Sequence, residues 1–134
     1  MRDGHFENAF RAFDEAVARQ GDNYRAILHS AACRRRLAEE HIEAREFEKA
    51  VALLEEALRV AAKGDPWPLE CAAEARREAY DAAFLAAKVC RFQLGSNTRA
   101  LPFLLKAQTF SSTPEVIDML ARIEQEPCAG HEKA

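Results

Sequence analysis

Two pairs of side chains in this sequence have spacings at which a metal ion could be held. His29 and Cys33 are four residues apart, so on a helix they would share one face, and Cys128 and His131 have half the spacing of a zinc knuckle. A thiol beside an imidazole could also serve as a nucleophile. The sequence places no third or fourth ligand near either pair. We therefore expect no metal site and no cofactor, and a Cys/His metal or thiol enzyme is only a remote alternative.

Other enzyme signatures are absent from the sequence. It contains no glycine-rich phosphate-binding loop, no serine nucleophile elbow and no His-Glu-x-x-His motif. The glutamates between residues 39 and 56 lack the Glu-x-x-His pairing of a di-iron bundle, and we interpret them as a solvated face. We expect a protein without catalytic activity.

Charge and hydropathy exclude two further classes of function. The 19 basic and 22 acidic residues leave a net charge of -3, which disfavours a nucleic-acid binder held by bulk positive charge. No apolar run approaches the roughly 18 residues of a membrane span, and the first residues lack a signal-peptide core. These features predict a cytoplasmic protein that binds neither nucleic acid nor membrane.

Basic residues nevertheless gather locally. Arg34, Arg35 and Arg36 are consecutive, and Arg76 and Arg77 form a second group, with Lys88 and Arg91 further along. Such a cluster could hold an acidic, partly apolar peptide by charge-assisted hydrogen bonds combined with burial. The alternative is that each arginine pairs with a nearby glutamate, as Arg36 could with Glu40 at i, i+4, and only keeps the chain in solution.

The elements that carry these residues are predicted to be helices. The chain has 27 Ala and 12 Leu against only 12 β-branched residues, a composition that favours helix over strand. Glycines at 4, 21, 64, 95 and 130 separate stretches with helical periodicity, and Gly21 is expected to cap the first helix. A phase slip of the apolar stripe predicts a tight turn at residues 44–46. We expect one domain over residues 1–126 and a flexible tail over 127–134.

About six helices follow from these signals. They are expected at residues 6–20, 24–44, 46–63, 69–92, 97–110 and 114–126. The expected N-terminal cap of the second helix is Asp22 or Asn23. Residues 96–98 are expected to cap the fifth helix, and Ser112 or Thr113 the sixth. The helix at 69–92 is apolar most of the way round, so we expect it to be an interior layer. Trp67, between two prolines, either covers helix ends beneath it or is an exposed anchor for a partner.

A pattern of small, bulky and small residues recurs three times. Shifts of 41 and then 50 residues superpose the copies. The copies are Ala9, Phe13 and Ala16, then Ala50, Leu54 and Ala57, then Ala100, Leu104 and Ala107. Short side chains at these places let antiparallel helices approach closely. The simpler alternative is a non-repeating helical bundle, in which amphipathic helices share such a pattern because each packs one face on the core.

This pattern resembles the second helix of the tetratricopeptide repeat, in a variant with lengthened helices, over residues 4–124. The resemblance implies an all-α fold in which antiparallel helix pairs form a right-handed superhelical stack. It pairs 24–44 with 46–63 and 69–92 with 97–110, makes 114–126 a capping helix, and leaves 6–20 as the second half of an incomplete pair. The usual 34-residue period and the landmarks of the first helix are not reproduced.

The resemblance also implies a concave groove that binds another protein. The family's groove positions, joined by two arginines of the basic cluster, fall on Arg34, Arg35, Glu39, Ile42, Glu43, Arg77, Leu85, Val89 and Phe92. The family's carboxylate clamp of Lys and Asn is not reproduced, which argues against a chain-terminal carboxylate as ligand. We expect a scaffold module that binds an acidic, partly apolar peptide or helix. The alternative is a structural or oligomerisation subunit with no peptide groove.

The first helix carries a separate expectation. Because it lacks the partner that a complete repeat would supply, Phe6, Phe10 and Phe13 are expected to be partly uncovered. The chain is then either a piece of a longer repeat array or a protein that self-associates through this helix.

Overall fold

The computed structural model describes residues 2–20 and 23–125, with side chains from residue 6 onward. All regular elements in these ranges are helical, as the composition predicts. They are α1 (Arg2–Arg19), α2 (Tyr24–Glu43), α3 (Phe47–Ala62), α4 (Leu69–Lys88), α5 (Asn97–Phe110) and α6 (Pro114–Gln125), with a π-helical turn, η1 (Val89–Gln93), continuing α4. The expected cap at Gly21 and the expected tail at 127–134 lie outside the described residues.

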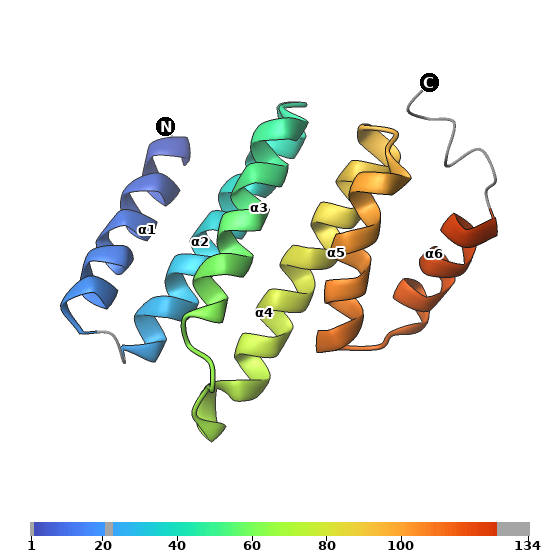
Figure 1. Cartoon of the computed structure of the whole chain (residues 1–134). Coiled ribbons are helices and arrows are strands. Elements are labelled where there is room, and N and C mark those ends of the chain that lie inside the picture. Colours follow the sequence, from blue (N-terminus) through green and yellow to red (C-terminus); the bar gives the residue numbers. More distant parts are fainter. Residues whose placement is uncertain (1, 21–22, 126–134) are drawn as a thin grey trace.

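The helices stand in a row in the order of the chain (Figure 1). α1 lies at one end of the row and α6 at the other, and the chain reverses direction at each turn (Figure 1). Each helix packs against its neighbours in sequence, and α2 also contacts α4. The row is open, because its first and last helices do not meet (Figure 1).

Side-chain caps begin three of the helices where the sequence predicts them. Asn23 Oδ1, Ser96 Oγ and Thr113 Oγ1 each accept a hydrogen bond from the backbone N–H three residues on, over 3.2, 3.1 and 3.3 Å. Each bond satisfies an amide that the first helical turn leaves without a partner. The caps therefore fix where α2, α5 and α6 begin.

The tight turn between α2 and α3 is also confirmed. α2 ends at Glu43 and α3 begins at Phe47. Arg45 has a φ of 63°, a left-handed conformation that interrupts helical geometry. The apolar stripe changes phase here because the chain ends one helix and starts another.

The repeated triplets of α3 and α5 form the centre of the core. Their six residues are each at most 1% exposed: Ala50, Leu54, Ala57, Ala100, Leu104 and Ala107. The α1 copy is only half-buried. The triplets thus mark equivalent positions on two helices, each of which packs on the helix before it.

α4 packs against apolar clusters on two sides, as expected of an interior layer, but a third face that includes Glu74 and Arg77 is exposed. Ala82 and Ala86 pack into the apolar cluster formed with α2 and α3, whereas Ala83 and Ala87 pack into the cluster formed with α5 and α6. A helix can serve two cores in this way only if its side chains are short, because interiors are close-packed. α4 therefore connects the two halves of the row.

Leu104 and Leu105 offer a direct test of this core. Leu104 is fully buried, whereas the next residue, Leu105, is 48% exposed. We expect Leu104→Ala to lower the free energy of unfolding by about 2–5 kcal/mol through lost burial and a cavity. Leu105→Ala, the matched control, should change it by no more than about 0.5 kcal/mol. Urea unfolding followed by circular dichroism measures both, and equal effects would contradict the assigned core.

Candidate partner-binding surfaces

Arg34 lies inside the structure, not in a groove. Its side chain is 9% exposed; Nη2 is 2.7 Å from Asp14 Oδ2 on α1, and Nε is 3.1 Å from Glu56 Oε1 on α3. The guanidinium also donates to Ser30 Oγ and lies 4.1 Å from the centre of the Phe10 ring. Arg34 is thus engaged by α1, α2 and α3 together, and this geometry corrects its assignment to a partner-binding surface.

Arg34 lowers the pKa of the Asp14 carboxyl. Burial raises the pKa of Asp14, but hydrogen bonds from Arg34 and Ser30, with the charges of Arg34 and Lys63, outweigh it and leave the pKa below its ordinary value. The carboxylate is therefore ionised at neutral pH and holds α1 on α2.

Arg35 is occupied by a second set of ion pairs. Its Nε is 2.5 Å from Glu78 Oε2 on α4, and its Nη1 is 2.9 Å from Glu39 Oε2. The Glu78 side chain is only 14% exposed, so this pair lies partly out of water. Arg35 and Glu78 fasten α2 to α4, the two helices on which the groove was expected.

Some of the predicted groove positions do meet on the α2–α4 face. Arg35, Glu39 and Leu85 line a hollow of about 250 Å³, together with Asp81, Phe84 and Lys88. The Lys88 ammonium lies 4.8 Å from the centre of the Phe84 ring. The basic groups at this face are therefore already engaged by acidic or aromatic side chains.

The other predicted positions are dispersed. Val89 is buried in the core and Ile42 is half-buried against both apolar clusters, so neither offers a free side chain. Glu43 is exposed and Phe92 is 61% exposed. Arg77 lines a different hollow, near the end of α5. The expected groove is thus not one continuous surface.

The three phenylalanines of α1 are half-buried. Phe10 lies beneath the Arg34 guanidinium, and the Phe13 ring centre is 5.1 Å from that of His29 on α2. Phe6 is also half-buried. Phe10 and Phe13 thus turn part of their surface toward α2, and self-association through α1 stays a prediction.

The candidate metal pairs gain no third ligand within the described residues. No group of three His, Cys, Asp or Glu side chains able to hold a metal ion occurs there. Burial raises the pKa of the Cys33 thiol, which disfavours the reactive thiolate. Cys128 and His131 lie outside the described residues.

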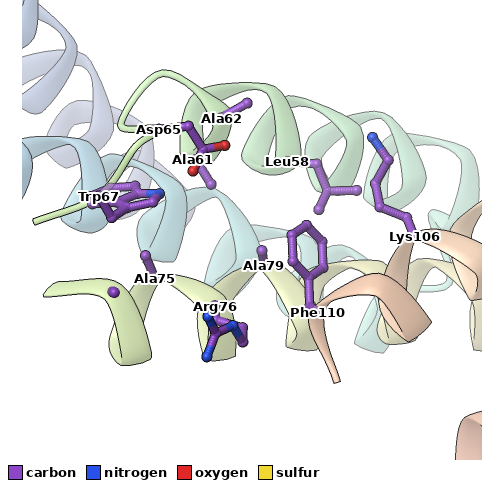
Figure 2. Close-up of a pocket in the computed structure, with 11 residues that line it drawn as sticks. Leu58, Ala61, Ala62, Asp65, Trp67, Ala75, Arg76, Ala79, Lys106 and Phe110 are labelled. Atoms are coloured by element: carbon purple, nitrogen blue, oxygen red, sulfur yellow. The ribbon is translucent and has the colours of Figure 1, made fainter. Parts of the chain in front are cut away.

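A further concavity lies between α3 and α5. Two adjoining hollows of about 490 and 510 Å³ share Leu58, Ala62 and Lys106. In Figure 2, Leu58 and Ala61 of α3 lie above Ala75 and Ala79 of α4. We call this surface the α3–α5 groove. It is lined by Val51, Glu55, Leu58, Arg59, Ala61, Ala62, Asp65, Trp67, Ala72, Ala75, Arg76, Ala79, Arg99, Pro102, Phe103, Lys106 and Phe110.

Trp67 lies at one side of the first hollow, and Phe110 lies toward the other side (Figure 2). Trp67 is half-buried and packs against Gly64 and, with ring centres 5.8 Å apart, against Tyr24 of α2. It therefore covers helix ends, one of the two roles that the sequence left open, and also forms a wall of the groove.

Three cations of the groove have no counter-ion within the described residues. The side chains of Arg59, Arg76 and Lys106 make no hydrogen bond or ion pair there. Arg99, by contrast, bonds Glu48 through both terminal nitrogens, over 2.8 and 2.9 Å. The sequence pattern did not predict this surface, although the helical spacing of Leu58 and Ala62 and the alanine run of α4 are signals of it.

Comparison of the chain with models of known protein families, with curated proteins and with solved structures gives no match. Along the described residues, no helix has the length and apolar content needed to cross a bilayer. The resemblance to the tetratricopeptide repeat therefore stays a prediction from the sequence pattern.

Arg34 and Arg36 distinguish a structural arginine from a solvated one. We expect Arg34→Met to lower the free energy of unfolding by about 1.5–3 kcal/mol, because it removes charge-assisted hydrogen bonds at a buried site. Arg36→Met, at an exposed neighbour, should change it by no more than about 0.5 kcal/mol. Urea unfolding measures both, and an Arg34 variant as stable as the parent would contradict the assigned network.

Gly64 tests the wall formed by Trp67. A Cβ at Gly64 would lie 2.4 Å from the Trp67 ring, so Gly64→Ala must displace the indole, shift the emission of the chain's one tryptophan and lower stability by about 1–3 kcal/mol. In the control Gly95→Ala, the new Cβ meets open space at a φ of 65°. That variant should lose stability to backbone strain with native emission unchanged. Unchanged emission in Gly64→Ala would refute the packing.

Proposed function

We propose that this chain is a non-catalytic protein-interaction module built as a tetratricopeptide-like stack. In this proposal α2 pairs with α3, α4 pairs with α5, α6 caps the last pair, and the pairs follow a right-handed superhelix. The partner is a segment of another protein, and no cofactor takes part.

One observation carries the proposal: the repeated burial of the small–bulky–small triplets. Leu54 and Leu104 occupy equivalent, fully buried places on α3 and α5, each flanked by buried alanines. Equivalent packing at alternate helices is typical of repeat proteins built from helix pairs, in which each unit contacts only its neighbours. Such an array exposes long surfaces along its row of helices, and a partner can bind there. The helices of this chain also form an open row (Figure 1).

A second candidate function is a structural or oligomerisation subunit. Its support is apolar surface near the α6 end of the row, where Leu101, Leu105 and Ile117 are 37%, 48% and 50% exposed. Another repeat unit or another copy of the chain could cover these side chains.

Affinity capture from the native cell lysate, at low and high salt, separates the two functions. The interaction module should retain a specific protein at low salt and lose it at high salt, because the cations of its surface are exposed and screened. Light scattering of the purified chain should give the monomer mass over a range of concentrations.

Recovery of the chain alone, together with a mass that rises with concentration, would contradict the proposal and favour oligomerisation. The buried Arg34 must stay unchanged in such work, because its loss would weaken the fold as well as any binding.

A further inference from the structure

We propose that the α3–α5 groove is the docking site, and that its occupant is an amphipathic helix of another protein with acidic residues beside an apolar ridge. This inference rests on the proposed function and adds the location of the site and the chemistry of the partner.

The groove has an apolar interior made of residues from three helices. Leu58 of α3 faces Phe110 of α5 across the hollow, and the alanines of α4 form the floor (Figure 2). Phe103 and Pro102 continue the apolar lining into the second hollow. The short side chains of the floor leave the space that a row of larger side chains from a partner would fill.

The dimensions favour a helix as occupant. The residues that line the groove run from Val51 to Ala62 on α3 and from Arg99 to Phe110 on α5, so each wall is about 18 Å long at a rise of about 1.5 Å per residue. Lys106 lines both hollows, so the concavity is continuous along these walls. A docked helix of about three turns would match this length and would place apolar residues at i, i+4 and i+7 in the two hollows.

The charge of the groove selects the partner. Two carboxylates, Glu55 and Asp65, line it together with four cations, of which only Arg99 has a counter-ion in the described part of the chain. On the α2–α4 face, Arg35 is already paired with Glu78 and Glu39. Arg59, Arg76 and Lys106 are thus placed to pair with carboxylates beside the apolar ridge of a docked helix.

Selection from a displayed peptide library tests both the site and the chemistry. The probe is a library of 18-residue helices with leucine fixed on one ridge and Glu, Lys, Gln or Ala at the flanking positions, selected against the full chain. The strongest binders are then measured by fluorescence anisotropy against two charge-matched variants. Arg76→Glu with Lys106→Glu alters the groove, and Arg36→Glu with Arg45→Glu alters exposed cations elsewhere.

We expect the selected peptides to be rich in Glu at the flanks. The groove variant should bind them about tenfold or more weakly than the parent, whereas the control variant should bind within about twofold. Circular dichroism must give both variants the parent's helicity and melting temperature; if the groove variant fails this requirement, Lys106→Gln alone should still weaken binding.

Three results would overturn the inference. The first is selection of Lys-rich or uncharged flanks, or of no binder at all. The second is that the groove variant still binds the peptides, whereas Lys88→Glu, a substitution on the α2–α4 face, abolishes binding. The third is self-association of the parent that the groove variant removes, which would make a second copy the occupant. In the first two cases, specific capture of a protein from the native lysate would leave the proposed function standing.

Discussion

The helices of this chain approach one another along faces made largely of alanine, and the positions of its cores and hollows follow from that constraint. Buried alanines on two sides of α4 let this one helix belong to two apolar clusters, so α4 itself joins the two halves of the row. Short alanine side chains also shape the surface. Where Ala75 and Ala79 face the gap between α3 and α5, their side chains cannot fill it, and the groove remains.

Arginine has two separate roles in the molecule. Arg34 and Arg35 tie α2 to α1, α3 and α4 through carboxylates, and the low exposure of Arg34 makes these contacts part of the fold. The lowered pKa of Asp14 means that this carboxylate stays charged to a lower pH than an ordinary aspartate does. Arg59 and Arg76 instead lie at the α3–α5 groove without acidic partners among the described residues. The molecule thus separates the cations that hold helices together from those that remain available for binding.

Local signals predicted the helices. The cap at Ser96 and the phase slip before Phe47 depend on residues within a few turns, and both are confirmed. The small–bulky–small triplets are buried on α3 and α5, but the copy on α1 is only half-buried. The surfaces were harder to predict because they depend on distant residues. Arg34 looked like part of an exposed cluster, but its partners Asp14 and Glu56 are 20 and 22 residues away along the chain. The groove needs three helices, so no single stretch of sequence reveals it.

The central claim is that this chain binds another protein through the α3–α5 groove. Site-specific photo-crosslinking in the native lysate tests it most directly. A photoreactive residue would replace exposed Ala62 in the groove in one form of the protein, and exposed Glu39 on the α2–α4 face in another. If the α3–α5 groove is the docking site, position 62 will give a discrete cross-link to a different protein and position 39 will give none. Cross-links from position 39 alone, or only between copies of the chain, would contradict it.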